Sequence, residues 1–257
     1  MEDVHNNIEK RNVSIERVGI NNFRLPFCYR SLYDYNTIAS IISGVCVGCS
    51  EKGAHLSRII EVLNELLANK ILKLEDFSTI IKALADRIEK KDIELTVSFP
   101  TLIETKSPIT NKISYIDSEV EVKVMLKNNT IYKDVSLKMN GAMCCPSSKK
   151  ISKYGAHSQR CLLKSTIVDA KDDLLIEDVA NILQKCFSAP VFSVVKREDE
   201  KYMTETAYEN PKFSEDLIRD VLLNLKRKYK DSEIIAEMEN YESIHSHNVY
   251  AKGYLKW

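Results

Sequence analysis

The stretch EVEVKVMLK, residues 119–127, alternates apolar side chains with mostly charged ones. Its apolar positions are Val120, Val122, Val124 and Leu126. Successive side chains of a β-strand point to opposite faces, so this period of two predicts a strand that is buried on one face only. Another strand is predicted before it, at residues 92–104 (DIELTVSFPTLIE). The elements that precede this pair define the fold class.

Two helices are predicted before these strands, because apolar residues recur there at spacings of three and four. Their apolar faces comprise Leu56, Ile59, Ile60, Leu63, Leu66 and Leu67 in the first helix, and Phe77, Ile80, Ile81, Leu84 and Ile88 in the second. Residues 13–24 and 35–47 come earlier, are rich in β-branched side chains and are predicted to be strands. The first half therefore has the order β-β-α-α-β-β, which belongs to the α+β class.

The second half repeats this order of elements without an obvious repeat of the sequence. Its predicted elements are strands at 131–143 and 160–169, helices at 175–187 and 214–229, and strands at 233–241 and 247–256. We therefore predict two tandem modules, residues 1–130 and 131–257, of which the second carries most of the candidate metal ligands. The polar run 127–134 is the predicted join.

The composition is that of an ordinary globular protein. Of 257 residues, 44% are hydrophobic and 29% are charged, which excludes a disordered chain, a collagen and a coiled coil. The 37 basic residues balance the 37 acidic ones. A net charge of zero argues against a general nucleic-acid-binding surface, so an anionic ligand must be met by a local basic cluster.

The sequence predicts a cytoplasmic protein without a membrane span. Its seven cysteines are odd in number and lack the spacing of a disulfide framework. The most apolar stretch, residues 35–49, is shorter than the ~20 residues of a membrane helix and is predicted to be a buried strand. The beginning of the chain, MEDVHNNIEKRN, lacks the apolar core of a signal peptide.

Thiols, imidazoles and carboxylates gather in a few dense polar segments of the second half. These segments are residues 144–149 (CCPSSK), 155–160 (GAHSQR), 196–200 (KREDE) and 242–247 (ESIHSH). Such donors together suit zinc, or a harder ion such as manganese or iron. The alternative is that Cys145 and His157 are buried, hydrogen-bonded residues and that the acids are exposed to water.

Two segments of the first half have both a functional and a structural interpretation. Cys46-x-x-Cys49 has the spacing of half a metal site, but no second pair follows, which favours reduced and partly buried thiols. Residues 52–58 (KGAHLSR) place cations and donors near a helix start, where backbone N–H groups bind anions. The alternative is a helix start with exposed charges. Three other cysteines are predicted to be packing residues: Cys28, Cys161 and Cys186.

Glu215 also has two interpretations. Its carboxylate offers two acceptors side by side, which match the two adjacent donors of a guanine or pterin ring. The alternative is an acid in the first turn of a helix, where the helix dipole favours it. Ser214 is the predicted N-cap of that helix.

Together these motifs resemble GTP cyclohydrolase I of type IB. The matching segments follow the family's order along almost the whole chain: Val18-Gly19 within IERVG, KGAHLSR at 52–58, CPSSK at 145–149, YGAHSQR at 154–160, KREDE at 196–200, ENPKFSED at 209–216 and ESIHSH at 242–247. The resemblance implies the tunnelling fold, with tandem β-β-α-α-β-β modules, antiparallel sheets and helices on one face. It also implies a homotetramer with active sites at subunit boundaries.

The implied activity is hydrolysis of GTP at C8 to formate and 7,8-dihydroneopterin triphosphate, the first step of folate biosynthesis. The implied cofactor is a divalent zinc, manganese or iron ion. By the resemblance, the metal-site residues are Cys145, His157, Glu200, Glu242 and His245, of which Cys145 and His157 are also catalytic. Glu215 matches the acid that anchors guanine. The candidates for holding the triphosphate or ribose are Lys52, His55, Ser57, Arg58, Lys149, Gln159 and Arg160.

One position departs from the family's pattern. Ser147 stands where members often carry a second cysteine. Cys144 is predicted to point to the opposite face of its strand from Cys145, so it is not expected to replace that cysteine.

Other functions also fit parts of this pattern. An archaeal relative makes a cyclic phosphate product with iron, and a nitrile reductase or pterin synthase of the same fold performs different chemistry. Release of formate from GTP would distinguish a GTP cyclohydrolase from the nitrile reductase and the pterin synthase. A non-catalytic metal-binding protein of this fold would not need Glu215.

Overall fold

The computed structural model of the protein describes residues 8–256. Residues 1–7, part of the segment in which no signal peptide is expected, and residue 257 lie outside the described residues. The strands are β1 (Ile15–Arg30), β2 (Asp34–Val47), β3 (Ile71–Leu72), β4 (Ile93–Lys106), β5 (Ile113–Lys127), β6 (Thr130–Cys144), β7 (Ser158–Val168), β8 (Glu233–Asn240) and β9 (Val249–Leu255). The helices are α1 (Leu56–Leu66), α2 (Asp76–Ile88), α3 (Pro146–Ile151), α4 (Ile176–Cys186), α5 (Arg197–Glu209) and α6 (Ser214–Lys228).

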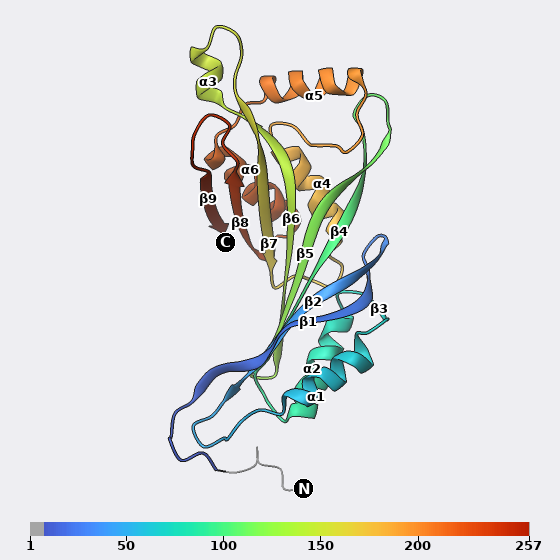
Figure 1. Ribbon diagram of the computed structural model, residues 1–257, viewed down its shortest axis with the longest axis vertical. Helices are drawn as coiled ribbons and strands as arrows, with labels where there is room; N and C mark the ends of the chain where they lie inside the picture. The colour runs from blue at the N-terminus through green and yellow to red at the C-terminus, as the bar shows by residue number, and fades with distance from the viewer. Residues whose placement is uncertain (1–7, 257) are drawn as a thin grey trace. The chain divides into compact units, whose positions relative to one another are not determined.

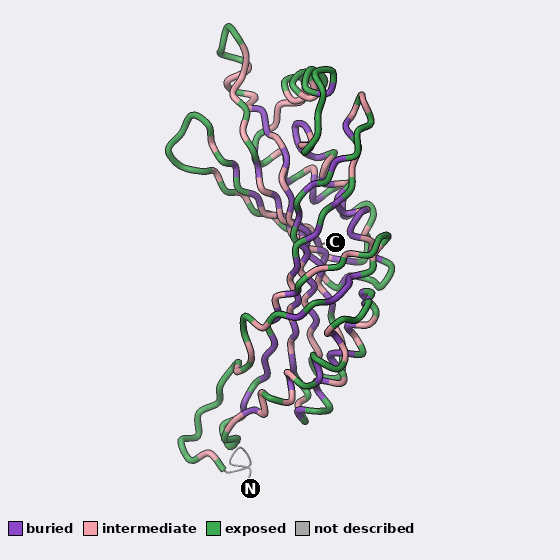
Figure 2. Tube along the Cα trace, turned by 45° about the vertical axis from the view of Figure 1, so that its right-hand side comes forward, coloured by how far each residue is buried: buried purple, intermediate pink, exposed green. Residues whose placement is uncertain are grey.

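The described strands form one nine-stranded sheet in the order β3-β1-β2-β4-β5-β6-β7-β8-β9. Buried and exposed residues alternate along the strands, as Figure 2 shows. In β5 the predicted residues Val120, Val122 and Val124 are fully buried, which confirms the period-two prediction. The sheet and the six helices confirm the α+β class.

The chain divides into two compact units. The first comprises residues 1–100, 121–134 and 171–174, and the second comprises 101–120, 135–170 and 175–257. The unit limits fall inside the long strands β4, β5 and β6. The division into modules at residue 130 stays a prediction.

In the first unit, helices α1 and α2 pack against each other beside β1 (Figure 1). All five apolar residues predicted for the face of α2 are buried. The core includes Phe27 and Tyr29 of β1, whose rings each lie 5.1 Å from the Phe99 ring. Strand β3 was not predicted, and it pairs parallel to β1 over two residues. The predicted strand at 35–47 is confirmed as β2.

The predicted join at residues 127–134 is a tight turn followed by the start of β6. Strand β5 ends at Lys127 and β6 begins at Thr130. The two residues between them, Asn128 and Asn129, have φ values of 49° and 64°. Two left-handed residues in a two-residue loop match the right-handed twist of a hairpin, and asparagine tolerates this conformation better than most residues.

In the second unit, α6 packs against α4 and against β8 and β9 (Figure 1). The stripe of α6 that includes Leu217, Val221 and Leu225 is fully buried, which confirms the predicted helix. Helices α3 and α5 were not predicted. Helix α3 has only six residues, and α5 (REDEKYMTETAYE) lacks an apolar stripe. None of the helices in residues 8–256 has the length and apolarity needed to cross a bilayer.

Candidate active site

Cys145 lies at the junction between β6 and α3, in the second unit. It is the N-cap of α3, with Pro146 in the first turn. Its sulfur accepts a hydrogen bond from the backbone N–H of Ser148 at 3.4 Å. A thiolate accepts such a bond more strongly than a thiol does. Cys144 is buried while Cys145 is partly exposed, so the two side chains lie in different surroundings, as the alternation along a strand predicts.

His157 is held beside Cys145 by backbone and side-chain contacts. The N–H of Cys145 donates to the His157 carbonyl at 3.1 Å, and the N–H of His157 donates to Ser148 Oγ at 3.2 Å. His157 Nδ1 lies 2.9 Å from Oε1 of Gln159. Because an amide oxygen only accepts, Nδ1 donates in this contact, and in the neutral ring the lone pair of Nε2 is then available to a ligand. Metal-binding histidines are typically oriented in this way.

Glu242 joins the same network through Gln159. The Gln159 Nε2 group donates to Glu242 Oε1 at 3.4 Å, and Ser243 Oγ lies 3.3 Å from His157 Nδ1. The structure therefore brings Cys145, His157 and Glu242 together, with Gln159 between the imidazole and the carboxylate.

Glu200 and His245 do not join this network. Both residues are exposed, and the His245 ring stacks on His247 at a centroid distance of 5.3 Å. Within residues 8–256, no three His, Cys, Asp or Glu side chains come close enough to hold a metal ion. The donor types nevertheless fit a divalent ion, because Cys145, Glu242 and the free Nε2 of His157 supply the sulfur, oxygen and nitrogen ligands that zinc, iron and manganese accept.

Asp199, next to Glu200, was not predicted as a site residue. It is fully buried and accepts hydrogen bonds from the N–H groups of Ile109, Thr110 and Lys196, each at 2.9 Å, and from the Thr110 hydroxyl. Burial alone raises the pKa of a carboxyl, but these hydrogen bonds outweigh it and hold the pKa of Asp199 well below its usual range. The contacts fix the first turn of α5, on which Glu200 lies.

Glu215 lies in the first turn of α6 and is exposed. The N-cap is Phe213 rather than the predicted Ser214, whose hydroxyl accepts a hydrogen bond from Asn240 at 3.0 Å. Asp216 accepts the N–H of Phe213 at 3.1 Å and so caps the helix. The Glu215 carboxylate has no hydrogen bond or ion pair within the described residues, which leaves both oxygens available to a ligand.

The candidate phosphate-binding residues are divided between the two units. In the second unit, Arg160 is exposed, and the Lys149 ammonium donates to the Tyr208 carbonyl at 2.6 Å and lies 4.3 Å from the Tyr208 ring centroid. Their role in substrate binding stays a prediction, as does that of Gln159.

In the first unit, the predicted helix start is confirmed, with His55 as the N-cap of α1. Lys52 pairs with Glu9 at 3.2 Å, and Arg58 donates to the Arg87 carbonyl at 3.2 Å. Ser57 is exposed. The anion-binding role of these residues stays a prediction.

The exposure of the other cysteines differs from one prediction and agrees with another. Cys46 and Cys49 are both exposed rather than partly buried. The three predicted packing cysteines, Cys28, Cys161 and Cys186, are buried.

Comparison with known proteins identifies the family. The family model described as type I GTP cyclohydrolase folE2 matches residues 1–251. Proteins named GTP cyclohydrolase FolE2 from Fervidobacterium nodosum and Syntrophobacter fumaroxidans are 36% and 35% identical to this chain. The first alignment covers 98% of this chain and 96% of the relative, and the second covers 98% of each. The FolE2 protein of Dictyoglomus turgidum is 34% identical over the full length of both chains.

Solved structures of urate oxidases share the fold. Uricase from Arthrobacter globiformis superposes with a TM-score of 0.53 at 7% identity, covering 94% of this chain and 93% of that one. A mutant of Bacillus sp. TB-90 urate oxidase gives 0.54 at 8% identity, covering 95% of this chain and 100% of that one. At such low identity the likeness concerns the fold alone, which is the tunnelling fold in both. The family model and the full-length matches agree with the sequence motifs: the chain belongs to the type I GTP cyclohydrolase folE2 family.

Proposed function

We propose that this protein opens the imidazole ring of GTP at C8, releases formate and forms 7,8-dihydroneopterin triphosphate. Relatives named GTP cyclohydrolase, about 35% identical over the full length, support a GTP cyclohydrolase I activity. The structural observation that carries the proposal is a chain of contacts: Cys145 donates its backbone N–H to His157, His157 contacts Gln159, and Gln159 donates to Glu242. The archaeal-type reaction is not favoured by these relatives.

The proposed metal ligands are the thiol, the imidazoles and the carboxylates of one set: Cys145, His157, Glu200, Glu242 and His245. A divalent ion bound there would lower the pKa of a coordinated water from 15.7 towards ~7, which supplies hydroxide at neutral pH. His157 is oriented by Gln159 so that Nε2 faces outward from the contact. An imidazole can also move protons at neutral pH, which ring opening and loss of formate require.

Glu215 is the proposed guanine anchor. The ring N–H and exocyclic amine of guanine are two adjacent donors, and both Glu215 oxygens are available. The capping role belongs to Asp216, so helix stability does not require Glu215. The basic and polar candidates Lys52, His55, Ser57, Arg58, Lys149, Gln159 and Arg160 are proposed to hold the triphosphate or ribose.

The proposal also includes a homotetramer that works in the cytoplasm. The tandem modules of the family support the assembly, and the odd number of cysteines supports a reducing compartment.

Incubation of the purified protein with GTP and Mn²⁺ or Zn²⁺ tests the activity. We expect formate release and a pterin that becomes fluorescent after oxidation. Removal of metal with a chelator should abolish turnover, and Cys145→Ala should lower both the bound metal and the turnover. The exposed Cys49→Ala is the matched control and should retain both. Pterin formation without formate, or full activity in the metal-free protein, would contradict the proposal.

A further inference from the structure

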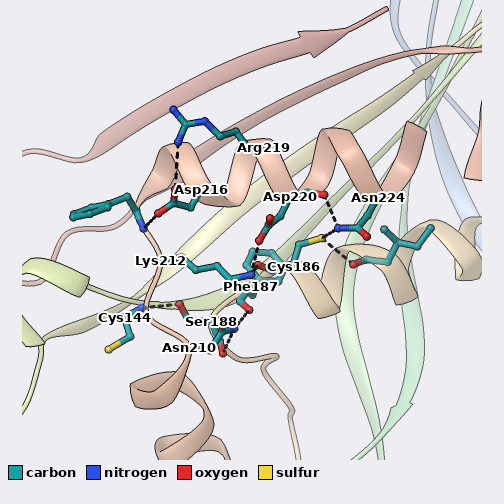
Figure 3. Close-up of polar contacts among 12 residues, drawn as sticks. Cys144, Cys186, Phe187, Ser188, Asn210, Lys212, Asp216, Arg219, Asp220 and Asn224 are labelled. Atoms are coloured by element: carbon teal, nitrogen blue, oxygen red, sulfur yellow. Dashed lines mark hydrogen bonds and ion pairs between the residues drawn. The ribbon is translucent and has the colours of Figure 1, made fainter. Parts of the chain in front are cut away.

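Lys212, in the short segment between α5 and α6, makes three polar contacts with different parts of the second unit (Figure 3). Its backbone N–H donates to the Cys144 carbonyl at the end of β6, at 3.0 Å. Its ammonium donates to the Cys186 carbonyl at the end of α4, at 2.7 Å. The same ammonium pairs with Asp220 in the second turn of α6, also at 2.7 Å. Lys212 therefore links one strand and two helices.

Neighbouring contacts hold the same elements together. Asn210 donates from Nδ2 to the carbonyls of Phe187 and Ser188, at 3.1 and 3.2 Å. The Ser188 hydroxyl in turn accepts the N–H of Cys144 at 3.1 Å. The Phe187 ring lies against Gly141 of β6, where an added Cβ would come within 2.1 Å of the ring. These contacts leave the end of β6 little freedom to move.

Two of the three linked elements, β6 and α6, lead to the two parts of the proposed active site. Cys145 directly follows Cys144, and Glu215 follows Lys212 by three residues. We propose that Lys212 is a positioning residue, which fixes the guanine anchor Glu215 relative to Cys145. This inference rests on the proposed function.

The environment of Lys212 suits this role. Its side chain is 14% exposed, so the ammonium is largely withdrawn from water, and both of its partners are oxygen acceptors. Charge-assisted hydrogen bonds of this kind are stronger and more directional than neutral ones. Loss of the ammonium would remove the polar link between the second turn of α6 and the end of α4. A shift of about 1 Å in a group that orients a substrate can cost about 100-fold in rate.

The test combines Lys212→Met with Glu215→Gln. Lys212→Met keeps the length of the side chain and the backbone bond to Cys144 but removes the ammonium. We expect it to lower kcat/KM for GTP at least ~10-fold, with bound metal unchanged. In the Glu215→Gln background the same substitution should have no further effect, because the anchor it positions is already lost. Lys228→Met is the matched control, since Lys228 pairs with Asp178 at 2.6 Å from the other end of α6. It should leave kcat/KM unchanged.

Each other outcome has a definite meaning. Wild-type kcat/KM in Lys212→Met overturns the inference, as does an equal loss in both backgrounds, which would show a general structural role. If Lys212→Met does not fold, Asp220→Ala removes only the contact to α6 and should show the same dependence on Glu215; wild-type kinetics there overturn the inference too. A wild-type protein that does not release formate from GTP would instead reject the proposed function, and the inference would fail with it.

Discussion

At the start of α6, two adjacent acids have different surroundings. Asp216 accepts the backbone N–H of Phe213 and an ion pair from Arg219 at 3.2 Å. Glu215 has neither kind of contact within the described residues and is exposed. Because Asp216 already caps the helix, capping does not require Glu215, and Glu215 can take the proposed role of guanine anchor.

Glu215→Gln tests this division of roles. The substitution keeps the shape but places an amine donor against a guanine donor, which leaves buried groups unpaired at a cost of ~1–3 kcal/mol each. We expect kcat/KM for GTP to fall at least ~10-fold, since 1.36 kcal/mol corresponds to a factor of ten. Bound metal and thermal stability should not change. Asp216→Asn is the control and should lower stability more than activity. Wild-type kinetics in Glu215→Gln would reject the anchor role.

The burial of each cysteine determines which thiols should react with an alkylating reagent. Burial raises the pKa of the Cys161 thiol to about 12 and that of Cys186 to about 11, so both stay protonated and inaccessible at pH 8. Cys46 and Cys49 are exposed. Brief alkylation of the native protein with iodoacetamide, followed by peptide mass spectrometry, should modify Cys46 and Cys49 but not the buried pair. All four should react after unfolding. Modification of native Cys161 as fast as Cys49 would contradict the described packing.

The sequence predicted the residue types of the site better than their contacts. Cys145, His157 and Glu242 were identified from motifs that resemble a known family. The hydrogen bond from Gln159 to Glu242 joins residues that are 83 positions apart in the sequence. The hydrogen bond from Thr110 to Asp199 joins residues that are 89 positions apart. Periodicity and motif spacing carry no information about such pairings, because they arise only when strands and loops come together.

Among the elements, the regular periods were predicted and the short or polar segments were not. Helices α1, α2, α4 and α6 each bury an apolar stripe, and the pattern of that stripe is visible in the sequence. Helix α5 has one buried residue, Asp199, and is fixed by hydrogen bonds instead of apolar packing. Strand β3 has only two residues, too few to show a period.

The turn between β5 and β6 should limit which residues can stand at position 129 without loss of stability. Asn129 has a φ of 64°, in the left-handed region that β-branched residues rarely adopt. Asn129→Val should lower the free energy of unfolding by about 1–2 kcal/mol. Asn129→Gly is the matched control and should leave stability unchanged or slightly higher, because Asn-Gly is the favoured pair in such turns. Urea unfolding measures both. Equal stability of the two variants would show that the turn is not under this conformational constraint.

At the scale of the whole molecule, the sheet has two edges. Strands β3 and β9 are the end members of the sheet order. On β9, Tyr250 and Tyr254 are 62% and 72% exposed. Edges with unpaired backbone groups and exposed aromatic side chains favour association with another chain.

The homotetramer that the family resemblance implies would have a mass four times that of one chain. Light scattering coupled to size-exclusion chromatography measures the mass, and GTP turnover in the same fractions shows which species is active. Activity should follow the tetramer and fall on dilution if the assembly dissociates. A monomer with full activity would contradict the proposed assembly.

Gly141 restricts how this chain can vary. An added methyl group at this position would lie 2.1 Å from the Phe187 ring, which is itself buried. Every non-synonymous single-base change of a glycine codon introduces either a Cβ or a stop. Phe187 is 2% exposed, so packed neighbours leave its ring little room to turn away from the added group. In a random library under selection for GTP cyclohydrolase activity, codon 141 should therefore accumulate only silent changes, unless a smaller residue replaces Phe187 in the same gene.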